Sequence, residues 1–580
     1  MKNKYFPNIW SSRQIFRLSG LDGVTDSGSP FWAKTGLKKY EFILQTDPNV
    51  HIMLPSDNKS ILNIFTNDCL KYRNRNHKNY CVFLNQSSIL GTCNHKYKPY
   101  ILKLESKYGF EVISKTNRNY ECDFVKLKKG FLLLKKIFLS SREVKWVLVH
   151  EEDNEERLYQ KADTALIYNI KELFKKRISS INSAVSSLPS NISIEQNKIA
   201  KKAISILRAN IKSPEGRFLS HWSNPSFIHV NLNLWDTLFH SFGIRMISHG
   251  LAERDIFSLL TAQREDGYIP NPVNPDPSFD RINRIHPPLI GWALWKLYKT
   301  GENKSLLAVG YPKVKKFIEW IQKNRDENNN LLLEWKSLHD GGNSPGGESG
   351  RDNDVRFDEM EKFDAVDFTG FIGNEVLHLS KIAKELGFLD EAEYWGNEHK
   401  KLFKVVNQEL WDETDKFYYD KKLDGSFIKI KTNASFIVLL GGLATEERAM
   451  IMVKDHLINV NEFWTELPVS SVSISERKFE KDYWRGPVWL CYNLLIHDGL
   501  LRYGFRKEAY LLAEKTVAAV EKWYRESGTI FEFYDCFNKK PPFELDSKKG
   551  TGRKIKGGVS EFSWSSAVYL YFLNYIKTAG

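Results

Sequence analysis

Two acidic side chains, each in a distinctive segment, could carry out acid–base chemistry. Asp352 lies in GGESGRDND, residues 346–354, and Glu532 lies in IFEFYD, residues 530–535. Glycine loses much conformational entropy on folding, so a run of it marks backbone that bends sharply or lets another group come close. Hydrolysis of a glycosidic bond usually needs two carboxyl groups, one protonated and one ionised. Taken singly, Asp352 could equally be a turn or capping residue, and Glu532 an edge-strand residue.

Aromatic residues stand beside acidic or amide residues in several other segments. Aromatic faces cover the apolar side of a sugar ring, while acidic and amide groups hold its hydroxyls. The combination therefore favours a carbohydrate site. The segments are LNLWD at 232–236, QREDGYIPNP at 263–272, EFWTELP at 462–468, YWRGPVW at 483–489 and EFSWSS at 561–566.

From about residue 195 onward, apolar residues recur with a helical period. Each odd-numbered predicted helix is followed by a long segment, whereas nearly every even-numbered one is followed by a few residues, as helix hairpins require. If the hairpins close into a ring, the long loops form one rim around a cavity. The predicted fold is therefore mainly α, an α/α barrel in which Asp352 of the third hairpin faces Glu532 of the sixth. The twelve predicted helices are at about 195–209, 234–247, 251–262, 287–300, 311–324, 366–386, 389–409, 432–441, 445–455, 486–503, 506–526 and 563–577.

Residues 1–155 show short alternating or apolar stretches between Asn, Gly, Asp and Ser clusters, which predict an N-terminal β-sandwich. The stretches include YEFILQT, VHIML, CVFLN, YILKLES and VKWVLVHEE. A helical linker is predicted at 156–194, where the polar segment SSINSAVSSLPSN marks a boundary. Residues 195–580 then form the barrel domain.

The positive charge of the chain is concentrated near its N-terminus. Residues 1–150 contain 25 Lys and Arg against 11 Asp and Glu, which leaves 59 against 60 for the rest of a chain of net charge +13. This module could bind phosphate-rich or acidic partners. A solvated lysine-rich surface is the simpler explanation, because no stacking aromatics alternate regularly with the basic residues. We therefore predict no nucleic-acid partner.

The sequence shows no secretory signal and no membrane-spanning segment. The N-terminal residues lack the features of a secretory signal, and the longest apolar candidate, GFLLLKKIFL, is interrupted by Lys135 and Lys136. We expect a soluble, cytoplasmic protein with no membrane partner.

The six cysteines contain no CxxC pair, which favours free thiols over the alternative of a disulfide within residues 69–122.

Three motifs carry a resemblance to a known family. ESGRDN resembles the ESGxDN signature of glycoside hydrolase family 63, which is related to the trehalases of family 37; EFYD is similar to the ExY(N/D) segment, and YWRGPVW resembles WRGPxW. The resemblance covers about residues 200–580. It implies an (α/α)6 barrel and an inverting α-glycosidase, with Asp352 as general acid and Glu532 as general base acting through water. It implies no metal and no other cofactor.

The resemblance also implies substrate-binding residues. Trp235 and Asp236 fall where the family binds the non-reducing sugar. From its own setting before Pro287-Pro288, we expect His286 to be a wall residue or hydrogen-bond donor rather than a metal ligand. The remaining candidates are Gln263, Asn353, Trp484, Arg485, Tyr534 and Trp564. Core packing is the alternative for the tryptophans, a loop hydrogen bond for Gln263, and a structural ion pair for Arg485.

Arg351 departs from the family pattern, which often has Trp there, and Asp354-Val355-Arg356 replaces Ser-Pro-Arg. Guanidinium binds carboxylate in a forked geometry. Arg351 could therefore pair with a carboxylate on the leaving group, as in a glycosyl-glycerate. The alternative is a salt bridge with Glu348 or Asp354.

The predicted function is hydrolysis of α-glucosidic or α-mannosidic bonds in a small oligosaccharide or glycosyl conjugate. A trehalase-like or glucan-acting barrel glycosidase is the first alternative, and a catalytically drifted carbohydrate-binding protein is the second. A carbohydrate is the predicted partner. The sugar, the aglycone and the oligomeric state stay open.

Overall fold

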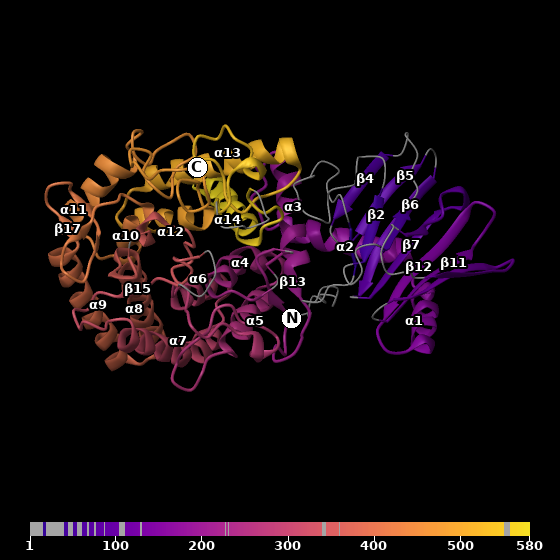
Figure 1. Ribbon diagram of the computed structural model, residues 1–580, viewed down its shortest axis with the longest axis horizontal. Coiled ribbons are helices and arrows are strands. Elements are labelled where there is room, and N and C mark those ends of the chain that lie inside the picture. The colour runs from indigo at the N-terminus through magenta and orange to yellow at the C-terminus, as the bar shows by residue number, and fades with distance from the viewer. Residues whose placement is uncertain are drawn as a thin grey trace. The chain divides into compact units, whose positions relative to one another are not determined.

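The computed structural model divides into two compact units, each described by itself (Figure 1). The first comprises Met1–Ser187, Ile204–Glu215 and Tyr524–Thr529, and the second Leu188–Ala203, Gly216–Trp523 and Ile530–Gly580. Residues 1–15, where no secretory signal was predicted, lie outside the described residues. The structure describes residues 16–18, 40–44, 50–54, 61–66, 69–74, 77–85, 87–103, 111–127, 130–226, 228–229, 231–338, 344–358, 360–549 and 557–579.

Antiparallel strands build the first unit. One sheet has the order β1-β2-β3-β8 and the other β4-β5-β6-β7-β12-β11-β10-β9. The five stretches predicted as strands overlap β2, β3, β6, β8 and β12. The strands of the first sheet are Phe16–Leu18, Tyr40–Leu44, Val50–Leu54 and Tyr100–Lys103; those of the second, β4 to β7 and β9 to β12, are Ile61–Thr66, Cys69–Asn74, His77–Asn85, Ser88–Asn94, Val112–Thr116, Tyr120–Lys126, Phe131–Phe138 and Glu143–Glu151.

Two helices pack on the larger sheet. Helix α1 (Glu155–Ile167) contacts β7, β11 and β12, and α2 (Ile170–Val185) contacts β6 and β7. Leu158 and Phe174 join sheet residues such as Val147 in one apolar core. Helix α2 continues to Val185, into the segment that was predicted as a polar boundary, because its buried apolar stripe includes Ile181.

Twelve helices lie in the described part of the chain beyond residue 188, and each overlaps one predicted helix. Helix α7 begins about two turns earlier than predicted, because its buried face extends N-terminal to Pro312. The helices α3 to α14 are Ile194–Asn210, Leu234–Ile247, His249–Leu260, Ile290–Gly301, Lys304–Asn324, Val366–Leu386, Leu389–Glu409, Ile437–Gly441, Glu446–Ile451, Leu490–Arg502, Arg506–Ser527 and Ser563–Thr578. The chain is thus mainly helical.

The even-numbered helices contact one another in succession. Helix α4 contacts α6, α6 contacts α8, α8 contacts α10, α10 contacts α12, α12 contacts α14, and α14 contacts α4 again. Helices α4, α10 and α12 are buried over nearly their whole surface, as expected of helices that are apolar all round. Because a long segment leads into the N-terminus of each even-numbered helix, these segments can bring their side chains together.

Candidate active site

A cavity of about 390 Å³ in the second unit brings together both predicted catalytic residues and four predicted binding residues. Asp352 comes from the segment before α8, and Glu532 from the segment before α14. The four predicted binding residues that line it are Trp235, Asp236, His286 and Trp564.

The glycine-rich loop that carries Asp352 packs against the indole of Trp235. The Ser349 hydroxyl donates to the Gly346 carbonyl at 2.7 Å, and the Gly346 amide donates to the Asp352 carbonyl at 2.9 Å. Gly350 has a left-handed φ of 74°, and a Cβ built there would lie 2.6 Å from Cζ2 of Trp235. Glycine is therefore required at this position both by the backbone and by the approach of the indole.

The two carboxyl groups have different surroundings. Asp352 is 24% exposed and forms an ion pair with Lys548, whose ammonium also donates to the Ser344 hydroxyl at 2.6 Å. Glu532 is only 2% exposed. Its Oε1 accepts from the Tyr483 hydroxyl at 3.1 Å, and its Oε2 accepts from the Val559 amide at 3.2 Å. The Glu532 carboxyl is thus held in one orientation by donors on both oxygens.

Asp236 and His286 are both shifted toward their neutral forms. Burial raises the pKa of Asp236 well above its usual range, and the charges of Glu532 and Asp352 raise it further. Burial lowers the pKa of His286 to about 3, with the Arg284 guanidinium adding to the effect. Asp236 can therefore donate a hydrogen bond as a protonated acid, and His286 is a neutral imidazole at ordinary pH.

Aromatic rings pack tightly around Trp235. The ring centroid of Trp235 lies 5.8 Å from that of His286, 5.7 Å from Trp564 and 6.1 Å from Trp484. Trp484 stacks on Trp489 at 3.9 Å, so Trp484 supports the wall from behind rather than lining the cavity.

Three further predicted binding residues use their side chains within the protein. Gln263 Nε2 donates to the carbonyls of Gly267 and Lys313, at 3.0 and 2.8 Å. The Arg485 guanidinium bonds Asp358 at 2.7 Å. These contacts favour the loop hydrogen bond and the ion pair over sugar binding. The Tyr534 hydroxyl accepts a hydrogen bond from the Phe531 amide at 3.0 Å. Gln263, Arg485 and Tyr534 are all absent from the lining of the cavity.

Asn353 and Arg351 flank Asp352, but neither lines the cavity. Asn353 Oδ1 accepts from the Trp484 amide at 2.9 Å. The Arg351 guanidinium is fully buried, forms an ion pair with Asp354, and donates to Asn433 Oδ1 at 2.6 Å. The structure thus favours the Asp354 salt bridge over recognition of a leaving-group carboxylate by Arg351.

Several cavity residues were not predicted. Tyr483 opens the motif YWRGPVW, so the motif contained a signal for it. Arg281 and Arg284 lie just before His286, and Lys548 lies in a lysine-rich segment without a distinguishing pattern. The lining also includes His229, Asn231, Asn233, Asn271 and Phe562.

The part of the chain that the structure describes has neither a candidate metal site nor a candidate membrane-spanning helix. It contains no cluster of three or more His, Cys, Asp or Glu residues suited to a metal ion. Among the described helices, none has the length and apolar character needed to cross a membrane. The six cysteines are all buried thiols.

Residues 229–565 match the family described as the mannosylglycerate hydrolase MGH1-like glycoside hydrolase domain. The chain belongs to this family, within glycoside hydrolase family 63, as the three motifs predicted.

Curated relatives include mannosylglycerate hydrolases and trehalases. Mannosylglycerate hydrolase MGH1 of Selaginella moellendorffii is 25% identical over 414 residues, which cover 58% of this chain and 79% of that protein. The cytosolic neutral trehalase of Kluyveromyces lactis is 27% identical over 257 residues, which cover 41% of this chain and 34% of the trehalase. A Borreliella burgdorferi protein is matched over 54% of its length. The chain therefore spans about a third of the trehalase and about half of the Borreliella burgdorferi protein.

Solved structures share the fold. The family 63 mannosylglycerate hydrolase of Thermus thermophilus, in complex with Tris, has a TM-score of 0.52 at 21% identity and covers 64% of this chain and 99% of that chain. A bacterial glucoamylase complexed with acarbose has a TM-score of 0.56 at 12% identity and covers 99% of this chain and 90% of that chain.

Proposed function

We propose that the chain is an inverting α-glycosidase that hydrolyses an α-mannosidic or α-glucosidic bond in a small glycosyl conjugate. The observation that carries the proposal is that Asp352 and Glu532 line one cavity from two different long segments. In an inverting reaction, the acid and the base act on opposite faces of the sugar, with room for a water molecule beside the base.

The two carboxyl groups take different roles in this proposal. Asp352, the more exposed carboxyl, protonates the oxygen of the leaving group. Glu532 takes a proton from water as the water oxygen bonds to the anomeric carbon and the glycosidic bond breaks. The hydrogen bonds from Tyr483 and Val559 orient the Glu532 carboxylate for this step.

The sugar ring would lie against the indoles of Trp235 and Trp564, with Asp236 as a hydrogen-bond donor to a hydroxyl. Burial of Asp236 supports this donor role, because a neutral carboxyl carries the required proton.

The leaving group would carry a carboxylate, as in a glycosyl-glycerate. Arg281, Arg284 and Lys548 all line the cavity and supply the positive charge that Arg351 was predicted to supply. Relatives named mannosylglycerate hydrolase support this choice. The trehalase relatives keep a neutral disaccharide as the alternative substrate.

We also propose an architecture for the chain. The contacts that lead from α4 through the even-numbered helices back to α4 support an (α/α)6 barrel within residues 195–580. The two antiparallel sheets support a β-sandwich within residues 1–155, and 156–194 would connect the two domains. Relatives named as cytosolic trehalases support a cytoplasmic location.

Turnover of mannosyl-glycerate, glucosyl-glycerate and trehalose by Asp352→Asn and Glu532→Gln tests the proposal. We expect each variant to lose about 10²–10⁴-fold in kcat while its Tm stays near that of the wild type. Asp266→Asn and Glu265→Gln are matched controls, because they make the same chemical changes outside the cavity. Wild-type turnover in either catalytic variant would overturn the assignment, and hydrolysis of trehalose alone would favour the alternative.

A further inference from the structure

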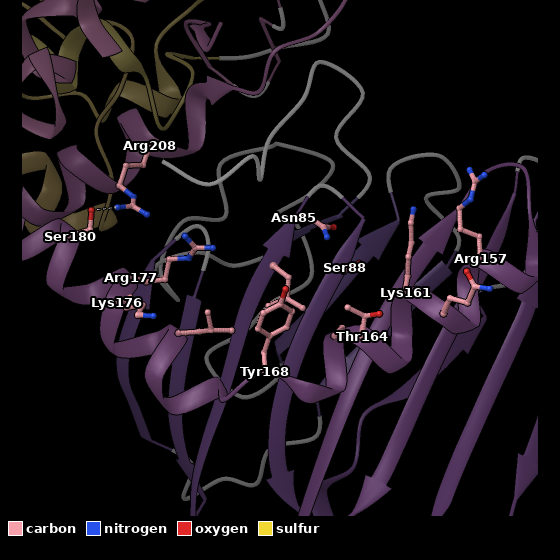
Figure 2. Close-up of a pocket in the computed structure, with 14 residues that line it drawn as sticks. Asn85, Ser88, Arg157, Lys161, Thr164, Tyr168, Lys176, Arg177, Ser180 and Arg208 are labelled. Atoms are coloured by element: carbon pink, nitrogen blue, oxygen red, sulfur yellow. Dashed lines mark hydrogen bonds between the residues drawn. The ribbon is translucent and has the colours of Figure 1, made fainter. Parts of the chain in front are cut away.

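The first unit contains a second cavity, of about 820 Å³ (Figure 2). Helices α1 and α2 form two of its walls, the adjacent ends of β6 and β7 form its floor, and Arg208 of α3 completes it. It is more than twice as large as the cavity that contains Asp352. The proposed glycosidase function assigns no role to it.

One face of each helix points into this cavity. On α1, Arg157, Lys161 and Thr164 recur at spacings of four and three, and on α2, Lys176 and Ser180 recur at a spacing of four. Side chains at these spacings lie above one another on the same side of a helix. The polar groups of both helices therefore converge on the same space.

The lining is strongly cationic. Five of the described residues that line it are Lys or Arg, and none of the described lining residues is acidic. Lys161 and Arg157 both pair with Glu151, at 2.5 and 3.9 Å, and Lys176 pairs with Glu172 at 2.8 Å. Both glutamates lie outside the lining, so the groups that face the cavity are cationic. A concave surface of one charge focuses the electrostatic field and attracts counter-ions. The five cationic residues are Arg157, Lys161, Lys176, Arg177 and Arg208.

The cations form two groups with an apolar region between them. Figure 2 shows Lys176, Arg177 and Arg208 on one side, and Arg157 and Lys161 on the other. Tyr168 lies between the two groups, and Leu84, Ala165 and Leu173 add apolar lining.

Hydrogen bonds fix the first of these groups. The Arg208 guanidinium donates to the Ser180 hydroxyl at 2.8 Å, and Arg177 donates to the Phe83 carbonyl at 3.1 Å. Two guanidinium groups and a hydroxyl are thus held at one end of the cavity, where Lys176 also lines it. This set suits the three oxygens and the double charge of a phosphate better than a single carboxylate.

We propose that this cavity binds a small organic bisphosphate, with one phosphate in each cationic group and the carbon skeleton over Tyr168. A nucleic acid fits less well, because proteins that bind single strands present a series of stacking aromatics along a groove. In the described lining, Tyr168 is the sole aromatic residue.

Isothermal titration calorimetry of the full chain tests the proposal. The probes are a hexose 1,6-bisphosphate, the hexose 6-monophosphate, citrate and a short oligonucleotide. We expect the bisphosphate to bind at least about tenfold more tightly than the monophosphate, because only it uses both cationic groups. Equal binding of the two sugar phosphates, tighter binding of citrate or the oligonucleotide, or no heat at millimolar bisphosphate would overturn the proposal.

Matched variants locate the site. Thr164 is exposed and lines the cavity, so Thr164→Glu places a negative charge there without disturbing the core. We expect Thr164→Glu and Arg177→Gln to weaken bisphosphate binding about tenfold or more. Thr164→Gln and Lys175→Gln should change it less than about twofold, because the first adds no charge and the second lies on α2 outside the lining. If Lys175→Gln weakens binding as much as Arg177→Gln does, or if Thr164→Glu has no effect, the ligand does not lie in this cavity.

Discussion

The hydroxyl of Tyr483 donates to Oε1 of Glu532 at 3.1 Å, which links the motif YWRGPVW directly to the proposed general base. Tyr483→Phe removes this bond and leaves the hydrogen bond from the Val559 amide in place. Because a hydrogen bond to a charged group is worth about 1.5–3 kcal/mol, we expect kcat to fall at least about tenfold with little change in KM. Tyr394→Phe, on an exposed tyrosine, is the control. A kcat within about twofold of wild type would show that this bond does not matter for the reaction.

Gly350 and Gly387 provide a matched pair for the packing of the acid loop. Both have left-handed backbone, with φ of 74° and 90°, but a Cβ meets the Trp235 ring only at Gly350, and nothing lies within 4 Å at Gly387. We expect Gly387→Ala to cost about 1–2 kcal/mol of unfolding free energy. Gly350→Ala should cost more and also lower kcat, because the loop that carries Asp352 must move. Equal unfolding free energies in urea, with full activity, would contradict this account.

We expect substitutions of Arg351 and Arg284 to differ in their effect on substrate selectivity. Arg351 is buried with Asp354, so Arg351→Met should lower the unfolding free energy by about 3–5 kcal/mol. The ratio of kcat/KM for glycosyl-glycerate to that for glycosyl-glycerol should not change. Arg284→Gln should lower this ratio about tenfold, because Arg284 lines the cavity. Arg264→Gln is the control, and a ratio that falls only in Arg351→Met would return the role to Arg351.

His286 provides a test by pH. Its pKa is lowered to about 3, mainly by burial, so its imidazole is neutral throughout the range above about pH 4. His286→Gln should therefore change the height of the pH–rate profile but leave both limbs in place between about pH 4 and 9. A limb that moves or disappears in this variant would identify His286 as a titrating group of the reaction.

The helices were predictable from the sequence because their apolar periodicity is strong. The same periodicity also predicted the short loops that follow nearly every even-numbered helix. The start of α7 was not predictable, because Pro312 lies inside a helix whose buried face continues on both sides. In the site, Trp235 and Asp236 were identified through the family resemblance, and both line the cavity. A motif does not show which side of a loop a side chain takes, and Gln263 and Arg485 bond within the protein instead. Lys548 reaches Asp352 from 196 positions away, a contact for which the local sequence has no signal.

The stereochemistry of the first product tests the central claim most directly. Wild-type protein is incubated with an α-mannosyl or α-glucosyl conjugate, and the anomeric proton of the released sugar is followed by NMR before mutarotation. Direct attack of a water held by Glu532 on the face opposite Asp352 gives the β-anomer first. An α-anomer as the first product would require a covalent intermediate or another arrangement of the carboxyl groups, and would contradict the account.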